Sequence, residues 1–559
     1  MSRATPHGTG ATAVFIPSPV FTIRAFHDAR PLAWIALGLA CLLLGGFLEL
    51  PEAIQAPGSD TGMFATQGAM LLHGARPYVD FWDLHPPLVF GYWASVQAIT
   101  GSDWLRTCVS IDPLAPQSCT GLAAHVLDLL LSVAAALVVA AIARQCGGSR
   151  ATAALAALLV VGFADQAMLS QEGSNPSKLT LLPSSVAVWA YLRSLADGRV
   201  GRSAVLAGVA AAIAGLAKQP ALLTLVALAG HAAWHAFTRP SEIDFRNRIQ
   251  GSPLIGLLVG FGATLAVACA ALAAAGALDG FVTQAWVYNV ERVLLGYFVH
   301  PPKPPVIGLD RVLTESAGAL AAFGVIGACS IARTTLHATQ RAVLWWALVN
   351  LIAITALREF VYVVPSTAVV AALGLGRLWR WPGLDRALGR GLLLAACLAC
   401  IVLTTGFQRG QLARARFERL GSALAQTEQL GWIFRRDLPP GPLFVYGNGA
   451  ELYPLANRTP ATRYLNAEAL RSTAPGVDKT RAELVTALRS NPPPVIVLAP
   501  HSDEAELDLA QYPAMRAFLQ DCYAQKPIRP DIDAHWAVLL RTAACAPDAS
   551  PAEGVPAPG

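Results

Sequence analysis

The stretch that decides the fold runs from Ser59 to Pro87 and reads SDTGMFATQGAMLLHGARPYVDFWDLHPP. It follows closely on an apolar run over residues 31–50, which has the length needed to cross a bilayer. The carboxylates of Asp60, Asp80 and Asp83 therefore lie at a membrane–water boundary, together with two histidines and an arginine. Carboxylates so close to lipid are costly unless protein or a wet cavity surrounds them, so this loop is predicted to form a functional site.

The composition is that of a chain that lies mostly in a membrane. Hydrophobic residues make up 54% of it, and the mean hydropathy is +0.47. Only 14% of residues are charged, against roughly a quarter in soluble proteins. Residues 1–30 are polar, and no small-residue cleavage pattern follows the first apolar run. We therefore expect a cytoplasmic tail over 1–30 and a first span that stays as an anchor.

Apolar runs of membrane-spanning length recur along the chain. They cover 31–50, 121–143, 151–169, 177–195, 203–217, 220–237, 253–276, 315–332, 342–357, 360–376 and 391–406. With the N-terminus inside, the short arginine-rich connections all fall on the cytoplasmic side, as the positive-inside rule requires. The predicted fold class is an α-helical polytopic membrane protein with about 11 transmembrane helices over residues 31–406. Its first outside loop spans 51–120.

An odd number of spans places the rest of the chain outside. The apolar pieces there are too short to span a membrane, and they favour buried strands at 443–446, 494–498 and 536–540, with helices at 478–490 and 503–520. This pattern predicts a small α/β extracytoplasmic (periplasmic) domain over 407–545. The Pro- and Ala-rich residues 546–559 are expected to be a disordered tail.

Four cysteines fall in the parts predicted to lie outside. Cys108 and Cys119 belong to the first outside loop, and Cys522 and Cys545 to the C-terminal domain. In an oxidising compartment each pair could form a disulfide, and unpaired thiols are the alternative for both.

Four segments of the chain resemble the GT-C glycosyltransferases, the superfamily of the protein O-mannosyltransferases and the lipid A aminoarabinose transferase. They are the opening loop, the run from Ala124 through Asp128, the Lys218-Gln-Pro turn, and the segment from Phe444 to Tyr464. The His85-Pro-Pro of the loop is similar to the mannosyltransferase type rather than to the Lys-Pro-Pro of the aminoarabinose transferase.

The resemblance implies a GT-C fold whose first outside loop carries the chemistry. It also implies a sugar donor linked to a polyprenyl phosphate or diphosphate, and transfer with inversion to an extracytoplasmic acceptor. That acceptor could be a cell-envelope glycan, a lipid or a protein, and the sugar is left open. The expected location is the bacterial inner membrane, in contact with the bilayer, with no nucleic-acid partner.

Asp60 is the leading candidate for the catalytic base. It lies where the resembling family carries its first catalytic carboxylate, and desolvation at a membrane face raises the basicity of such a group. It also precedes a helical pattern from Gly62 to Leu72, so the alternative is that Asp60 only caps this helix.

Asp83 and His85 form a second candidate pair. They alternate in an extended segment before Pro-Pro, so both side chains are expected on one side, where they could bind a phosphate or a divalent metal (Mn, Mg or Zn). The alternative is that His85 hydrogen-bonds within the loop and that no metal binds. Asp80 competes with Asp83 for the catalytic or substrate-binding role.

Cations near the outer ends of the spans are the candidates for binding the donor phosphate. Lys218 ends one apolar run and could bind as a point charge, or its ammonium could extend to the interface. Arg358 could bind a phosphate bidentately, or it could pair with Glu359. Lys178 begins another span and is a further substrate-binding candidate.

Two other classes of function are compatible with many spans. A transporter would carry polar groups near the bilayer midplane and would often show an inverted repeat, whereas here the polar clusters lie at the outer ends. A non-catalytic envelope scaffold is the remaining alternative. The sequence favours a glycosyltransferase over both.

Overall fold

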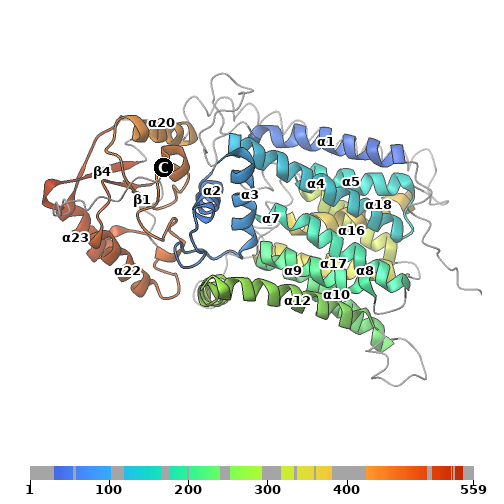
Figure 1. The fold of residues 1–559 in the computed structure, drawn as a ribbon. Helices are drawn as coiled ribbons and strands as arrows, with labels where there is room; N and C mark the ends of the chain where they lie inside the picture. Colours follow the sequence, from blue (N-terminus) through green and yellow to red (C-terminus); the bar gives the residue numbers. More distant parts are fainter. Residues whose placement is uncertain are drawn as a thin grey trace, which may run out of the picture.

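The computed structural model describes most of the chain. The described residues are 31–53, 58–101, 119–164, 176–197, 201–238, 252–292, 317–332, 336–357, 361–379, 423–499, 507–529, 532 and 536–545. They form a bundle of long helices and a smaller part with a β-sheet, and two short helices, α2 and α3, lie between the two (Figure 1).

The bundle helices match the apolar runs predicted from the sequence. They are α1 (Pro31–Ala53), α4 (Cys119–Gln145), α5 (Arg150–Ala164), α8 (Leu181–Asp197), α9 (Arg202–Ala217), α10 (Leu222–Thr238), α12 (Pro253–Ala274), α16 (Ala317–Ala332), α17 (Ala338–Leu357) and α18 (Val364–Leu378). Short helices join them: α7 (Pro176–Leu179), η1 (Gln219–Ala221), α13 (Leu278–Gly280), η2 (Phe281–Val287) and η3 (Val361–Val363). The run predicted at 391–406 lies outside the described residues.

Several of these helices have the length and hydropathy to cross a membrane. Within the described part of the chain there are five such segments, Pro31–Leu50, Gly121–Gln145, Gln219–Thr238, Pro253–Ala274 and Val361–Leu378. The helices α5 and α9 are equally apolar but shorter. The protein is therefore a multi-pass membrane protein.

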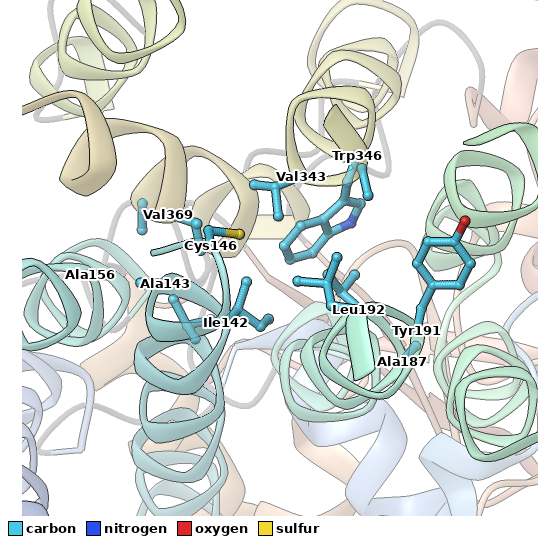
Figure 2. Close-up of a cluster of buried hydrophobic side chains, with 14 of the residues drawn as sticks. Ile142, Ala143, Cys146, Ala156, Ala187, Tyr191, Leu192, Val343, Trp346 and Val369 are labelled. Carbon is cyan, nitrogen blue, oxygen red and sulfur yellow. The ribbon is translucent and has the colours of Figure 1, made fainter. Parts of the chain in front are cut away.

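Small side chains allow the bundle helices to pack closely. Ala143 on α4 and Ala156 on α5 are fully buried, and Gly208 on α9 lies directly against the backbone of α12. Larger side chains fill the space that remains. Figure 2 shows Tyr191 of α8 and Trp346 of α17 in the hydrophobic cluster that also contains Ala143 and Ala156. Such dense packing fixes the outer helix ends, which carry the polar residues considered below.

In the described residues of the first outside loop, 58–101, there are two helices, α2 (Ser59–Leu72) and α3 (Leu88–Thr100). The helix predicted from Gly62 to Leu72 is confirmed as α2, and α3 runs across the direction of the bundle helices (Figure 1). Gly68 brings the two together, since a Cβ there would lie 2.6 Å from the backbone of Trp93. The loop is thus a compact unit between the membrane bundle and the C-terminal part.

The C-terminal part contains a four-stranded mixed sheet. Its elements are α20 (Ala423–Arg436), β1 (Leu443–Tyr446), α21 (Leu452–Ala456), η4 (Glu468–Leu470), α22 (Val477–Ser490), β2 (Val495–Leu498), η5 (Leu509–Gln511), α23 (Pro513–Cys522), β3 (Tyr523–Gln525), β4 (Ala537–Arg541) and η6 (Ala543–Cys545). The strand order is β1-β2-β4-β3, in which β1 and β2 are parallel and the other two pairings are antiparallel.

The predicted strands are confirmed as β1, β2 and β4, and the predicted helix at 478–490 as α22. The helix predicted at 503–520 is only partly correct. Within the described residues, η5 occupies 509–511 and α23 begins at Pro513, where a proline suits the first turn of a helix. The helix α20 and the edge strand β3 were not predicted.

Alternate residues of the sheet face two different hydrophobic clusters. Leu443 and Val445 of β1 join the cluster that contains α2, α3 and α20, whereas Phe444 and Tyr446 join that of α22 and α23. One face of the sheet therefore shares its core with the first outside loop. The cysteines Cys522 and Cys545 form a disulfide on the other side. The predicted pair Cys108–Cys119 cannot be assessed, since Cys108 lies outside the described residues.

Candidate functional site

Asp60 lies in the first turn of α2, and its surroundings are those of a reactive carboxylate. The helix N-cap is Gly58, which corrects the alternative in which Asp60 merely caps the helix. Asp60 is exposed to solvent, although many protein atoms lie around its carboxylate. Burial raises the pKa of Asp60, and the nearby positive charges of His85 and Lys218 oppose that rise.

Asp83 and His85 form a bonded pair beside Asp60. Oδ1 of Asp83 lies 2.7 Å from Nδ1 of His85 and accepts a second bond of 2.7 Å from the His85 backbone N–H. Oδ2 accepts a 2.7 Å bond from the side chain of Gln67 on α2. Asp83 is 1% exposed, so this carboxylate holds the imidazole in place and leaves Nε2 as the remaining polar atom of the ring.

The turn before this pair is fixed by Tyr78. Its backbone has a φ of 64°, a left-handed conformation that is uncommon for a bulky residue, and its hydroxyl donates a 2.7 Å bond to the carbonyl of His85. Gln284 of η2 donates to the Tyr78 carbonyl at 2.8 Å, and its side-chain oxygen accepts from the Asp83 N–H at 3.2 Å. The bundle thus anchors both ends of the segment that carries Asp83.

Asp80 has a different environment from Asp83. It is exposed and forms an ion pair of 3.1 Å with Arg76, whose backbone N–H also donates to it at 2.7 Å. The hydrogen bonds from Arg76 hold the pKa of Asp80 below its usual range. The structure therefore brings Asp83, and not Asp80, into the charged neighbourhood of Asp60, and it favours Asp83 over its competitor.

Lys218 reaches the same neighbourhood from the bundle. It is the C-cap of α9 and is only 8% exposed, and its Nζ donates a 2.9 Å bond to Ser177 of α7. The next residue, Gln219, donates to the carbonyls of Leu84 at 2.8 Å and Ala285 at 2.9 Å. This turn therefore holds the first outside loop and the cation in one fixed arrangement.

Lys178 forms an ion pair within the bundle. Its Nζ is fully buried and lies 2.9 Å and 2.7 Å from the two oxygens of Glu49 on α1, which is also 2.9 Å from Nδ1 of His125 on α4. This ion pair joins three helices of the bundle, next to Ser177. Glu49, at the end of the first span, was not singled out from the sequence. Its position in an apolar run was the available signal.

The C-terminal part closes the site from the other side. Glu468 of η4 contributes a negative charge near Asp60, and its carboxylate lies 3.2 Å from Arg292 and 3.5 Å from Arg471. Arg463 donates a 2.7 Å bond to the Tyr78 carbonyl. Sequence reasoning did not identify Glu468, whereas Arg463 lies within the segment that carried the family resemblance.

Two features of the predicted site are left without structural support. Arg358 lies outside the described residues. The described residues contain no group of three His, Cys, Asp or Glu side chains that could hold a metal ion. Both oxygens of Asp83 are engaged by Gln67 and His85, so these residues do not fit joint ligation of a metal, and no step is derived through one.

A comparison with known protein families identifies part of the chain. Residues 78–289, less than half of the chain, match the dolichyl-phosphate-mannose-protein mannosyltransferase family. The matched region contains Asp83, His85 and Lys218, and it ends in the segment just after η2. No curated protein matches the chain in sequence.

Solved structures match over most of the chain. ArnT from Cupriavidus metallidurans bound to undecaprenyl phosphate is 14% identical, with a TM-score of 0.55 over 93% of this chain and 100% of that one. The oligosaccharyltransferase AglB from Archaeoglobus fulgidus, in complex with an inhibitory peptide and a dolichol-phosphate, is 14% identical, with a TM-score of 0.55 over 92% and 75%.

A further structure of the Archaeoglobus fulgidus oligosaccharyltransferase, in complex with Zn and sulfate, is 15% identical, with a TM-score of 0.51 over 88% of this chain and 72% of that one. At these identities the likenesses show the fold, which is that of the GT-C glycosyltransferases, as the resemblance implied. The fold and the family match together support the interpretation that the protein is a glycosyltransferase.

Proposed function

We propose that this GT-C glycosyltransferase transfers a sugar from a polyprenyl-phosphate donor to a hydroxyl group of an extracytoplasmic acceptor, with inversion at the sugar carbon. The observation that carries the proposal is the position of Asp60. It is a carboxylate with a raised pKa that is exposed to solvent and lies near Lys218 and His85. Such a group can accept a proton, and its neighbours can stabilise an anion.

In this reaction the acceptor hydroxyl oxygen attacks the anomeric carbon of the sugar from the face opposite the phosphate. The bond between that carbon and the phosphate oxygen breaks, and the polyprenyl phosphate leaves with the electron pair. Asp60 takes the proton of the hydroxyl, since its enclosure makes it more basic than an ordinary aspartate.

Lys218 and His85 suit the departing phosphate. The Lys218 ammonium is nearly buried and is oriented by Ser177, so its charge acts on a phosphate with little screening. His85 is held in place by Asp83, whose Oδ1 lies 2.7 Å from its Nδ1, so the imidazole has a fixed position beside the base. The Lys218 cation, with the fixed imidazole of His85 beside it, stabilises the charge that develops as the bond to phosphate breaks.

The proposed sidedness follows from the arginine distribution. Short arginine-rich connections place the N-terminus in the cytoplasm, so the first outside loop and the C-terminal domain face the periplasm of a bacterial inner membrane. The disulfide between Cys522 and Cys545 supports this orientation, since such bonds persist in oxidising compartments. The acceptor is then a cell-envelope glycan, a lipid or a protein on that side.

Mass spectrometry of envelope glycans tests the proposal. Cells that lack the protein should lose one glycan modification, and the wild-type gene should restore it. Asp60→Asn should fail to restore it, whereas Asp80→Asn should restore most of it, because Asp80 lies on the exposed side of the loop. Full restoration by Asp60→Asn at normal membrane abundance would overturn the assignment of the base.

A further inference from the structure

Arg463 of the C-terminal part contacts both ends of a turn in the first outside loop, the turn 78–82. Its guanidinium donates a 2.7 Å bond to the carbonyl of Tyr78, and its own carbonyl accepts a 2.8 Å bond from the N–H of Trp82. Arg463 and Tyr78 are 385 positions apart in the chain. One residue of the C-terminal part thus spans the segment that leads directly into Asp83.

The turn needs support because Tyr78 is strained. Its φ of 64° is unfavourable for a bulky side chain and persists only where the surroundings hold it. The ring has no room to move, since it is 1% exposed and its centre lies 5.7 Å from those of the Phe90 and Phe281 rings. The carbonyl accepts bonds from Gln284 of the bundle and from Arg463. The strained conformation therefore depends on both parts of the molecule.

The two ends of the turn determine where His85 lies. The Tyr78 hydroxyl donates a 2.7 Å bond to the His85 carbonyl, and burial raises the pKa of Tyr78, so this hydroxyl keeps its proton and remains a donor. Trp82 directly precedes Asp83, whose Oδ1 lies 2.7 Å from Nδ1 of His85. A displaced turn would therefore disturb both the backbone and the ring of His85.

The segment that carries Arg463 is itself tied to the sheet. The N–H of Leu443 on β1 donates a 2.9 Å bond to the Thr459 carbonyl, and the Leu443 carbonyl accepts a 2.8 Å bond from the N–H of Ala461. Next to Arg463, the Tyr464 hydroxyl donates a 2.8 Å bond to Glu483 on α22. The core of the C-terminal part therefore fixes the position of Arg463.

We propose that Arg463 is a positioning residue of the transferase site, which keeps the turn 78–82 in its strained conformation and thereby holds His85 in place. The C-terminal part then contributes to the site through hydrogen bonds to the turn. That His85 acts on the donor phosphate rests on the transferase function proposed above. That Arg463 positions His85 does not.

Solid-state NMR of the full chain in phosphatidylcholine nanodiscs, with ¹⁵N-labelled histidine, tests this positioning. The chain has 11 histidines, so the ring signals of His85 are identified by their loss in His85→Gln. We expect narrow His85 signals in the wild type. Arg463→Met keeps the length of the side chain but removes the donor, so it should broaden and shift them. Arg463→Lys, which keeps a charged donor, should retain them.

Activity in cells should follow the same order. At normal membrane abundance, Arg463→Met should lower the glycan modification about tenfold, as expected for the loss of a hydrogen bond from a charged group. Arg463→Lys should retain most of it. Arg516→Met is the matched control, since it removes an exposed arginine of the same part and should change neither the His85 signals nor the modification.

Unchanged His85 signals in Arg463→Met would overturn the proposal, even if its thermal unfolding midpoint fell, because Arg463 would then only stabilise the fold. Equal disturbance by Arg463→Lys and Arg463→Met would also overturn it. Arg463→Gln, whose amide has a shorter reach, decides the matter if Arg463→Met does not fold. If the His85 signals stay unchanged while Asp60→Asn abolishes the glycan modification, only this inference is wrong.

Discussion

Asp60, Asp80 and Asp83 belong to one loop, but the protein gives each a different role. Asp80 is exposed and paired with Arg76, so it stabilises the loop locally. Asp83 is buried and orients His85. Of the three, only Asp60 combines a raised pKa with exposure to solvent. The sequence alone identified all three carboxylates as candidates. It could not distinguish between them, because their different environments depend on residues that are distant in the chain.

Glu468 offers a test of that neighbourhood. Its negative charge, like that of Asp83, raises the pKa of Asp60, whereas His85 and Lys218 lower it. Glu468→Gln removes one of the two negative charges, so the pKa of Asp60 should fall. We expect the Asp60 carboxylate to form at a lower pH in this variant than in the wild type. Infrared titration of the protein in nanodiscs, with the spectrum of Asp60→Asn subtracted, measures this directly.

The control for that titration is Asp521→Asn, which removes an exposed carboxylate of the same domain. This variant should leave the titration midpoint of Asp60 unchanged. An unchanged midpoint in Glu468→Gln as well would mean that Glu468 does not act on Asp60.

Asp60 should also reduce stability where it is ionised. The pKa of Asp60 is raised in the folded protein, so the folded state holds the Asp60 proton more tightly than the unfolded chain does. The free energy of unfolding therefore falls as the pH rises from the ordinary aspartate range through the raised pKa. Asp60→Asn should therefore raise the thermal unfolding midpoint at neutral pH, with a smaller gain below the ordinary aspartate range. A lower midpoint at neutral pH would contradict the raised pKa.

At the scale of elements, the position of α2 depends on close contact with the C-terminal part. The Ser59 hydroxyl accepts a bond of 3.3 Å from the Ala450 N–H, and Gly62 lies against the backbone of Glu451. The helix itself was predictable from its apolar spacing. Its partner was not, because the contact joins residues from opposite ends of the chain and leaves no local pattern in the sequence.

Gly62→Ala should disturb this contact. A Cβ at this position would lie 2.7 Å from the Glu451 backbone nitrogen, and backbone cannot move aside as a flexible side chain would. We expect a loss of about 1–3 kcal/mol in stability and reduced glycan modification, because α2 carries Asp60. Thermal unfolding and glycan mass spectrometry report the two effects.

Gly91→Ala is the matched control, since Gly91 also lies in a helix of the loop but a Cβ there would meet nothing within 4 Å. It should stabilise the protein by about 0.5–1 kcal/mol. Equal behaviour of the two variants would show that the contact between Gly62 and Glu451 does not position α2.

At the scale of the whole molecule, the bundle and the sheet are joined through the first outside loop. Hydropathy was enough to predict the bundle helices, because each span must be long and apolar whatever its neighbours. The short strands were predictable because a buried strand is a short apolar run. The helix α20 was missed because a polar run over 426–429 interrupts its apolar residues, in a segment that follows the last predicted span. Its packing on the loop could not be read from the sequence.

The disulfide between Cys522 and Cys545 should stabilise the C-terminal part. It joins residues 23 positions apart, and closing such a loop in the unfolded chain contributes about 2–4 kcal/mol. Cys522→Ser should make this part more sensitive to limited proteolysis, whereas Cys329→Ser, at an exposed free thiol, should not. Equal resistance of Cys522→Ser and the wild type would mean that the bond does not form in the cell.

The most direct test of the account is the pool of lipid-linked sugars in cells that carry Asp60→Asn. If Asp60 is the base of a transfer from a polyprenyl-phosphate sugar, the unused donor has no outlet. Mass spectrometry of lipid extracts should then show one polyprenyl-phosphate sugar accumulating with Asp60→Asn, and not with Asp80→Asn or the wild type. An unchanged pool of lipid-linked sugars with Asp60→Asn, at normal abundance of the protein in the membrane, would contradict the account.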